Sequence, residues 1–394
     1  MKLSRALCAL LLVVTMAFPL DADAQRRRAR RAPPPPPPPA VAQHVTIMDG
    51  ATGAILACEN CNEPIPPASM AKLMTILIVL EQLEAGRISY NTHFQVSEYA
   101  WREHGAMSTG SHMFLPIHSY VAVADLVQGA IVVSANDACV VLAEGIAGSE
   151  AAFVDMMNRR ARELGLTTAR FRNVTGVDHP EQRISSADLA RLARHIITTY
   201  PRFYEVYSRR SFTFNNRTQQ NRNPLLGAFP GADGVKTGHT DASGYGLVGS
   251  AVQNGQRRIV VFNGLPTMAA RNAEAQRLMR AAFEDYAMHT FAQAGAEIGQ
   301  ARVRLGSRRT VPLVTEREIT VVGLRAAQQN MTAHIVYNGP LTPPIQRGQE
   351  VARLVIEGPG MAPQEFPLQA GRRVGKANWF ARAWEGLRLT FFGP

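Results

Sequence analysis

Residues 66–85 read PPASMAKLMTILIVLEQLEA and predict a helix buried in the core of a globular domain. From Met70 to Ala85 the segment is apolar on nearly every side, without the polar face that a surface helix keeps toward water. The prolines at its start and Gly86 directly after it are ordinary start and stop signals for a helix. We therefore expect other elements to cover this segment on all sides.

A serine and a lysine lie three residues apart where this helix begins. The backbone N–H of Ser69 belongs to the unpaired donors at the positive helix end, a suitable site for a developing oxyanion. The amine of Lys72 lies over the same helix face as the Ser69 hydroxyl. Serine needs an adjacent base to act as a nucleophile, and lysine can be that base when burial and a nearby cation, for which Lys236 is the candidate, lower its pKa. By itself the pair also fits a capping serine beside a partly buried lysine.

A second motif, Ser134-Ala135-Asn136, lies between two segments with helical spacing, 122–133 and 137–145. We expect Ser134 to pass a proton between Lys72 and a leaving amine. Asn136 is expected to hold a substrate amide together with the Lys72 amine. Serine and asparagine are also favoured helix N-caps, so this motif alone has a purely structural interpretation.

A third motif, Lys236-Thr237-Gly238-His239, precedes a β-rich run and predicts an edge strand that lines a cleft. Lys236 and Thr237 are expected to bind a substrate carboxylate, and Gly238 to let a substrate backbone approach closely. The backbone N–H of His239 is the candidate second oxyanion donor, a contribution of about 10²–10³ in rate. Because no Asp pairs with His239, we expect its ring to pack locally.

The segments around these motifs predict an α+β domain over residues 44–294. Two hairpins are indicated, one around Asp49-Gly50 and one around Asn254-Gly255, the second being a strong turn signal. Strands come first and last with helices between them, which implies an antiparallel sheet sandwiched by helices. The expected strands are His44–Met48, Ala54–Cys58, Gly244–Val252 and Arg257–Asn263, and the expected helices further include 151–164, 186–199 and 268–294.

Residues 295–370 have a different texture and predict a small separate all-β domain. Short β-rich segments follow one another with glycine and proline turns between them. The expected strands are Ala301–Leu305, Thr310–Val314, Glu318–Val322, Ala333–Tyr337, Val351–Glu357 and Glu365–Gln369.

The N-terminal residues predict export. Residues 1–24 have a basic start, an apolar stretch and an Ala-Asp-Ala cleavage site, as a removed signal peptide does. Residues 25–43 form an Arg/Pro-rich linker whose prolines favour a stiff polyproline II spacer or a solvated leader. Of the formal charge of +11, five charges lie in this linker and a net four in the last 24 residues. The nearly neutral body argues against nucleic-acid binding, and the charged ends favour an anionic membrane surface as partner.

Residues 371–394 predict an amphipathic helix that lies on a membrane. Its apolar side chains, spaced to share one helical face, are Ala377, Phe380, Trp384, Leu387 and Phe391. Most basic residues fall elsewhere around the helix, a pattern typical of interfacial anchors. The alternative is a helix docked on the β domain.

Three cysteines remain after removal of the signal segment. Cys58 and Cys61 can form a redox pair or half of a metal site, although a zinc site needs two further ligands that do not follow. We expect a local disulfide in an oxidising compartment, with two inert thiols as the next alternative. Cys139 is expected to be a small buried helix residue. The sequence therefore implies no metal and no cofactor.

The three motifs, in this order, are the signature of penicillin-binding proteins and class A β-lactamases. From about His44 to its end the chain resembles the low-molecular-mass penicillin-binding proteins, which are serine-type D-Ala-D-Ala carboxypeptidases. The residues carrying this likeness also include Pro67-Ala68-Ser69, 136–139 (NDAC), 233–240 (DGVKTGHT), 173–176 (NVTG) and 185–190 (SSADLA). The segment 173–176 looks like the loop that floors the family's active site.

The resemblance implies a β-lactamase/DD-peptidase-like αβα domain, an acyl-enzyme on Ser69 and inhibition by β-lactams. It implies removal of the terminal D-alanine from peptidoglycan pentapeptides by a periplasmic enzyme attached peripherally to the outer face of the inner membrane. Asn221-Arg222-Asn223 resembles the stretch with the family's second cation, so Arg222 is a candidate for binding the terminal carboxylate.

Departures from the pattern disfavour a β-lactamase. Ala135 stands where β-lactamases often have Asp, and no Glu-x-x-Leu-Asn occurs between Asn173 and Asp188. A carboxylate that activates deacylating water is therefore missing. Two further functions compete with a carboxypeptidase, namely a D,D-endopeptidase that cleaves cross-links and a non-catalytic β-lactam-sensing or wall-binding module.

Overall fold

The computed structural model describes residues 41–325, 330–359 and 361–378. The predicted signal segment, nearly all of the Arg/Pro linker and most of the predicted C-terminal helix lie outside these ranges. The helix predicted over 371–394 is wrong for its described residues 371–378, where Val374 and Lys376 form β-bridges to Ile345 and Gly306. Among the described residues, none of the helices combines the length and hydrophobicity needed to cross a bilayer.

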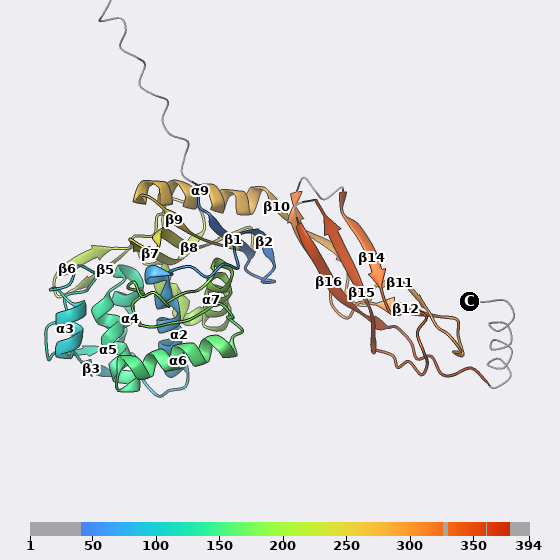
Figure 1. Ribbon diagram of the computed structural model, residues 1–394, viewed down its shortest axis with the longest axis horizontal. Helices are drawn as coiled ribbons and strands as arrows, with labels where there is room; N and C mark the ends of the chain where they lie inside the picture. The colour runs from blue at the N-terminus through green and yellow to red at the C-terminus, as the bar shows by residue number, and fades with distance from the viewer. Residues whose placement is uncertain (1–40, 326–329, 360, 379–394) are drawn as a thin grey trace, which may run out of the picture. The chain divides into compact units, whose positions relative to one another are not determined.

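The buried helix predicted from residues 66–85 is present (Figure 1). It begins with a 3-10 turn, η1 (Ala68–Ala71), and continues as α2 (Lys72–Glu84), in which every residue from Lys72 to Leu80 is buried. Exposing any side of this apolar helix to water would be unfavourable, so neighbouring elements cover it on all sides.

The central sheet has five antiparallel strands in the order β2-β1-β9-β8-β7. Their bounds are β1 (His44–Asp49), β2 (Ile55–Glu59), β7 (Ala232–Thr240), β8 (Gly244–Gln253) and β9 (Gln256–Leu265). Both predicted hairpins are confirmed, and β7 is an edge strand as expected.

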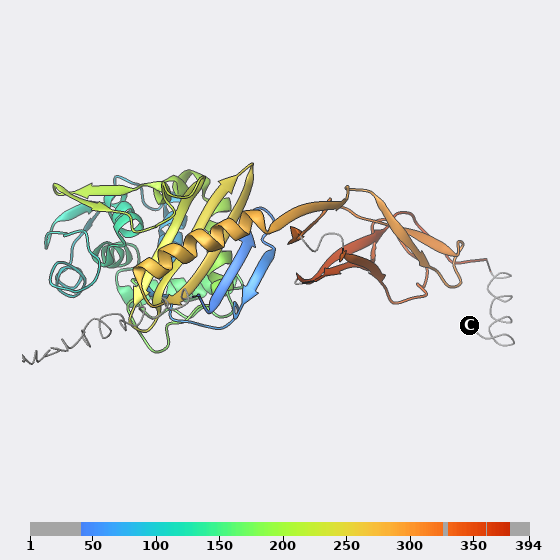
Figure 2. The same ribbon diagram turned by 90° about the horizontal axis from the view of Figure 1, so that it is seen from above.

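Alternate side chains of the sheet face two different cores, which makes the domain a three-layer αβα sandwich. In β9, Val260 and Phe262 pack with α9 (Met268–Glu284), which lies across the strands in Figure 2. Ile259 and Val261 face the opposite core, which contains α2 and α7 (Ser186–Thr199). Because successive side chains of a strand point to opposite faces, each strand carries apolar residues on both faces, as the predicted fold requires.

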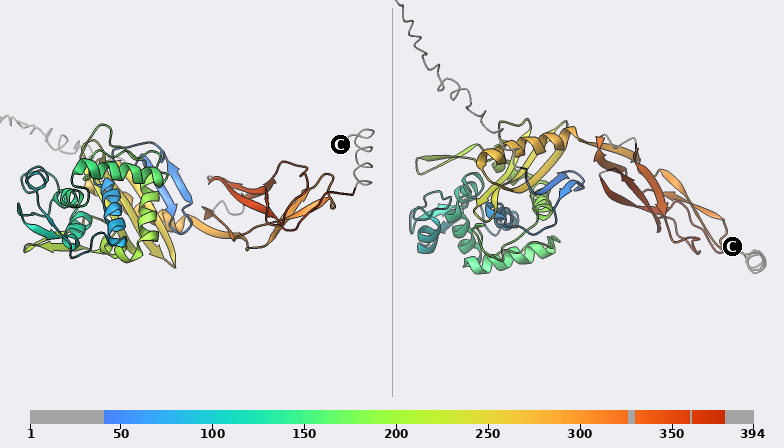
Figure 3. Two further views of the ribbon diagram at one scale, coloured as in Figure 1. Left: turned by 90° about the horizontal axis from the view of Figure 1, so that it is seen from below. Right: turned by 45° about the horizontal axis from the view of Figure 1, so that its top comes forward.

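The remaining helices build the layer opposite α9 (Figure 3). They are α3 (Glu98–His104), α4 (Val123–Gln128), α5 (Asn136–Ala147), α6 (Glu150–Glu163), α8 (Pro201–Tyr204) and the 3-10 turn η3 (Glu205–Ser208). Two small two-stranded sheets join them: β3 (His93–Gln95) pairs with β4 (Tyr120–Ala122) across the segment that contains α3, and β5 (Ser211–Phe214) forms a hairpin with β6 (Arg217–Gln220). The helix predicted over 122–133 is α-helical only to Gln128 and continues as a π-helix, η2 (Gly129–Val133).

The C-terminal part is a β domain, as predicted. Its five-stranded sheet has the order β11-β12-β16-β15-β14, with Val311, Leu313, Leu354, Ile356 and Leu368 in its core. The strands are β11 (Glu297–Arg302), β12 (Thr310–Val314), β14 (Thr332–Val336), β15 (Glu350–Gly358) and β16 (Met361–Ala370). A second sheet pairs β10 (Tyr286–Ala292) with β13 (Ile319–Leu324).

The helix predicted over 268–294 is wrong beyond Glu284. Residues 286–292 form β10, since their tyrosine, threonine and phenylalanine favour a strand and β13 supplies the partner that a strand needs. Helical spacing alone could not reveal that partner, which lies more than two dozen residues further along the chain.

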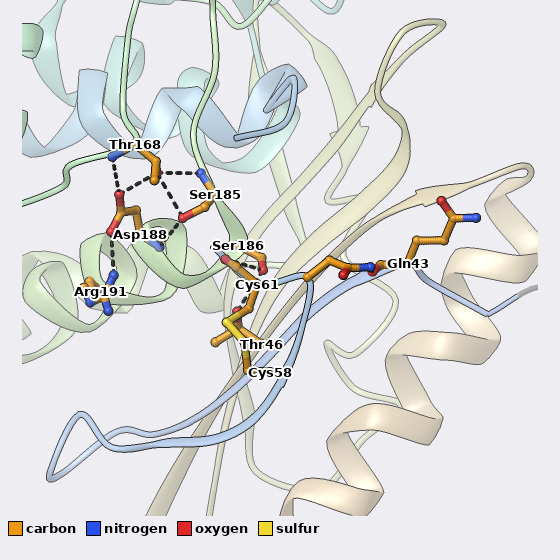
Figure 4. The surroundings of a disulfide bond; sticks show 10 residues. Gln43, Thr46, Cys58, Cys61, Thr168, Ser185, Ser186, Asp188 and Arg191 are labelled. Atoms are coloured by element: carbon orange, nitrogen blue, oxygen red, sulfur yellow. Dashed lines mark hydrogen bonds and ion pairs between the residues drawn. A yellow bond between two sulfur atoms is a disulfide. The ribbon is translucent and has the colours of Figure 1, made fainter. Parts of the chain in front are cut away.

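Cys58 and Cys61 form a disulfide, as expected (Figure 4). Cys58 is exposed near the end of β2, whereas Cys61 is buried beside the start of α7, where its carbonyl accepts a hydrogen bond from the Ala187 N–H at 2.9 Å. Cys139 is a free, buried thiol in α5, as expected.

Candidate active site

The Ser69 hydroxyl and the Lys72 amine lie together at the start of the buried helix. The Lys72 Nζ is 2.9 Å from the Ser69 Oγ, as the three-residue spacing predicted. Ser69 does not cap the helix, because Pro67 is the N-cap of η1 and no side chain there makes a capping bond. The purely structural interpretation of this pair is therefore wrong.

The amine of Lys72 has three oxygen partners. Its Nζ donates to the Ser69 Oγ, to the Asn136 Oδ1 at 2.7 Å and to the Thr175 carbonyl oxygen at 2.5 Å. Of these three partners only the Ser69 hydroxyl can also donate. Once Lys72 loses its proton, its two N–H groups can stay on the two carbonyl oxygens while its lone pair accepts from Ser69. This arrangement suits a base that removes the Ser69 proton.

Burial is the main reason why Lys72 can be neutral. It lowers the pKa of Lys72 from 10.5 to about 8, and the charge of Arg222 lowers it further, while Cys139 and Asp137 oppose the shift. We predicted Lys236 as a cation that helps to lower this pKa. The two amines do repel each other, because burial and then the charge of Lys72 hold the pKa of Lys236 well below its ordinary value, and such repulsion acts on both groups.

The Ser134-Ala135-Asn136 motif forms the predicted turn. Ser134 ends the π-helix in a left-handed conformation, with φ of 63°, and Asn136 begins α5. Ala135, rather than Ser134, is the N-cap of α5, and it makes no side-chain cap bond, so the capping interpretation of this motif is also wrong. Ser134 and Asn136 both line the cleft described below, and Asn136 holds the Lys72 amine as expected.

Strand β7 forms the opposite wall. Lys236 and Thr237 are buried in it, and the Lys236 Nζ donates to the Thr237 carbonyl at 3.2 Å. A Cβ on Gly238 would lie 3.0 Å from the Pro67 carbonyl oxygen, so this glycine lets β7 pack against the turn that carries Ser69. Gly238 thus has a packing role that we did not predict, and because it also lines the cleft, the close approach of a substrate backbone stays a prediction. The His239 ring stacks on Tyr245, as expected for local packing.

A cleft of about 390 Å³ opens between these two walls. Seven of the nine predicted site residues line it, and Lys72 and Lys236 are buried. The seven are Ser69, Ser134, Asn136, Arg222, Thr237, Gly238 and His239. Within the described parts of the chain, no group of three or more His, Cys, Asp and Glu residues could hold a metal ion.

Two guanidinium groups face the cleft, and sequence reasoning identified only one of them. Arg222 donates to the Ser111 Oγ at 2.7 Å, and the buried Arg271 donates to the Arg222 carbonyl at 3.1 Å and to the Asn272 Oδ1 at 2.9 Å. Among the described residues neither makes an ion pair with a carboxylate, so both can attract an anion. One feature of the sequence could have identified Arg271. It lies in the first turns of α9, where the helix dipole disfavours a positive charge, so a cation there suggests a function.

Comparison with known proteins agrees with this geometry. A family model described as D-alanyl-D-alanine carboxypeptidase matches residues 31–266, and one described as penicillin-binding protein 5, C-terminal domain, matches residues 286–376. The D-alanyl-D-alanine carboxypeptidase DacA of Haemophilus influenzae is 36% identical over 355 residues, 89% of this chain and 90% of that protein. DacD of Escherichia coli is 37% identical over 339 residues, 85% of this chain and 87% of that protein.

Solved structures resemble the chain in the same way. Penicillin-binding protein 5 from Haemophilus influenzae has a TM-score of 0.73 at 36% identity, covering 86% of this chain and 99% of that chain. Penicillin-binding protein D2 from Listeria monocytogenes, in an ampicillin-bound form, has a TM-score of 0.54 at 28% identity, covering 63% of this chain and 99% of that chain.

Proposed function

The chain belongs to the D-alanyl-D-alanine carboxypeptidase family, and on this basis we propose that it removes the terminal D-alanine from peptidoglycan pentapeptides and is acylated by β-lactams. One observation carries the proposal. The buried Lys72 Nζ lies 2.9 Å from the Ser69 Oγ and is held there by two carbonyl oxygens, and Ser69 lines a cleft that also holds two guanidinium groups without an ion pair among the described residues.

In the acylation step the Ser69 Oγ attacks the carbonyl carbon of the D-Ala-D-Ala peptide bond while Lys72 takes its proton. The N–H groups of Ser69 and His239 stabilise the oxyanion. Ser134 then passes the proton from Lys72 to the nitrogen of the leaving D-alanine, and the C–N bond breaks. Water hydrolyses the ester on Ser69 and restores the enzyme.

The acidic side chains near the cleft support slow hydrolysis of β-lactam adducts. A water-activating carboxylate must be free to accept a proton. In the segment 173–188, Asp178 accepts from the Thr240 hydroxyl, Glu181 pairs with two arginines and Asp188 pairs with Arg191. All three carboxylates are thus already held by other groups, which argues against a role as the water-activating base of a β-lactamase.

The cations of the cleft favour a substrate with a free carboxylate. Lys236, Thr237 and Arg222 would bind the carboxylate of the terminal D-alanine. This supports carboxypeptidase over endopeptidase action.

The direct test is release of free D-alanine from a purified disaccharide pentapeptide, measured beside a cross-linked dimer and nitrocefin. We expect D-alanine from the pentapeptide, little cleavage of the dimer and little turnover of nitrocefin. Preferential cleavage of the dimer would establish an endopeptidase, rapid nitrocefin turnover a β-lactamase, and no reaction at all a binding module.

For the variant Arg222→Ala we expect a KM for the pentapeptide about tenfold or more higher, with kcat changed far less. A charged hydrogen bond to the carboxylate is worth about 1.5–3 kcal/mol, and its loss weakens binding of substrate and transition state alike. Steady-state kinetics of D-alanine release give both constants. Arg202→Ala is the matched control, since the Arg202 side chain is 82% exposed and makes only a surface ion pair with Glu84. A large fall in kcat with unchanged KM would contradict the role of Arg222.

We further propose that residues 1–24 direct export to the periplasm and are removed, and that residues 371–394 attach the mature enzyme to the outer face of the inner membrane. The mature full-length chain should sediment with vesicles that contain anionic phospholipid, less so at high salt, whereas a chain ending at residue 370 should not. Penicillin labelling of both chains controls for folding. Equal sedimentation of the two chains would contradict an anchor in the last 24 residues.

A further inference from the structure

The loop 173–183 is held together by its own side chains. The Asn173 Oδ1 accepts from the Gly176 N–H at 2.7 Å, and the Asn173 Nδ2 donates to the Val177 carbonyl at 3.0 Å. The buried Gln182 accepts from two backbone N–H groups, those of Arg172 at 2.9 Å and of Asn173 at 3.0 Å, and donates to the same Val177 carbonyl at 3.2 Å. Because these hydrogen bonds connect residues of the same loop, we expect the loop to move as one unit.

The inner side of this loop touches the reacting groups. The Thr175 carbonyl oxygen accepts from the Lys72 Nζ at 2.5 Å and so orients the amine toward Ser69. Gly176 has φ of +86°, and a Cβ there would lie 2.0 Å from the Ala68 carbonyl oxygen, so the loop backbone packs directly against the turn that carries Ser69.

The outer side of the loop is tied across the cleft to strand β7. The Asp178 Oδ1 accepts from the Thr240 hydroxyl at 2.6 Å, and the Asp178 Oδ2 accepts from the Ala242 N–H at 3.4 Å. Asp178 and Thr240 both line the cleft, and 62 residues separate them in the sequence. We call this pair of bonds the Asp178 clasp.

The hydrogen-bond chemistry makes the carboxylate the favoured partner. A threonine hydroxyl has a single hydrogen, and the Ser243 N–H, 3.2 Å away, donates to the Thr240 Oγ1. The Thr240 hydrogen has two possible acceptors, the Ser243 Oγ at 3.1 Å and the Asp178 Oδ1 at 2.6 Å. Asp178 is the nearer of the two, and a hydrogen bond to a carboxylate is about twice as strong as one to a neutral acceptor.

We propose that Asp178 is a positioning residue for acylation, a role that rests on the proposed function. Its clasp connects the loop that orients Lys72 with the strand that carries Thr237 and His239. The base and the substrate-binding strand are thereby held at one separation. Asp178 acts through Thr240 and Thr175, without contact to the reacting atoms.

Asp178→Ala and Thr240→Val each remove the clasp. For each we expect kcat/KM for D-alanine release and the second-order rate constant of penicillin acylation to fall about 10–100-fold, because a displacement of about 1 Å can cost 10²-fold in rate. Thr240→Ser keeps the hydroxyl and should stay near wild type. The double variant should lose no more than either single variant, since both act through one bond. Thr213→Val is the matched control, because Thr213 also has a hydroxyl contact, to Thr218 at 2.8 Å, on a small hairpin outside the cleft lining.

A second readout does not depend on catalysis. Amide hydrogen exchange at Gly176, Val177 and Ala242 should become about tenfold faster in Asp178→Ala, with the melting temperature unchanged. Unchanged exchange at these amides would overturn the clasp, even if the wild-type protein released no D-alanine and the proposed function failed. Single variants within twofold of wild type, effects that multiply in the double variant, or failure of Thr240→Ser to preserve activity would overturn the positioning role while the wild-type activity stands.

Discussion

Replacing Ser69 by alanine should abolish both covalent labelling by a fluorescent penicillin and release of D-alanine. The Ser69 Oγ is the atom that would form the ester, and it lies 2.9 Å from the buried amine positioned to take its proton. Removing the serine nucleophile of a serine protease costs on the order of 10⁶-fold in kcat, and the effect here should be of that size. The substitution deletes one oxygen, so the fold should be kept.

Labelling followed on a denaturing gel, together with a D-alanine assay, measures both effects. Ser208→Ala is a suitable control, because Ser208 is an exposed serine at the end of η3 outside the cleft lining. Comparable melting temperatures would show that Ser69→Ala is folded. A penicillin adduct on the Ser69→Ala protein would show that another residue is the nucleophile.

Lys72→Met should reduce the rate constant of acylation by about 10²–10⁴-fold, the usual contribution of a positioned general base. In the wild-type enzyme this rate should rise with pH through about 8, because only the neutral amine has a lone pair and burial lowers the pKa of Lys72 to that value. Well below this pH the neutral fraction, and with it the rate, should fall about tenfold per pH unit. In the variant this dependence should disappear.

Stopped-flow acylation of wild type and Lys72→Met over a range of pH tests this prediction. Methionine leaves the Asn136 Oδ1 and the Thr175 carbonyl without their donor, a cost of about 1–3 kcal/mol each, so rates must be referred to the folded fraction. Lys376→Met removes an exposed lysine of the β domain and should leave the rate and its pH dependence unchanged. An unaltered pH dependence in Lys72→Met would assign the ionisation to another group.

Local spacing made much of the fold and the site predictable. Ser69 and Lys72 meet because residues three apart share a helix face, and the hairpins around 49–50 and 254–255 follow from their turn residues. The helix over 268–294 failed in its last third for the opposite reason. Whether residues 286–292 become strand or helix depends on a partner strand that no local pattern reveals.

The features of the site that the sequence did not predict depend on backbone atoms or on residues far away in the chain. The Thr175 carbonyl that contacts Lys72 is 103 residues away and has no side-chain signature. Arg271 reaches the cleft only because α9 begins beside the loop that carries Arg222. The packing role of Gly238 against Pro67 also became visible only in the structure.

The amino-acid sequence alone determined which groups are the candidate nucleophile and base and much of the order of strands and helices that carries them, because these follow from side-chain type and short-range geometry. Only the tertiary structure decided the pKa of these groups and the direction in which they point. Burial is the main cause that lowers the pKa of Lys72, and two carbonyl oxygens from other parts of the chain hold its amine beside Ser69. Dielectric environment and backbone acceptors arise only when distant segments pack together, so no local pattern encodes them.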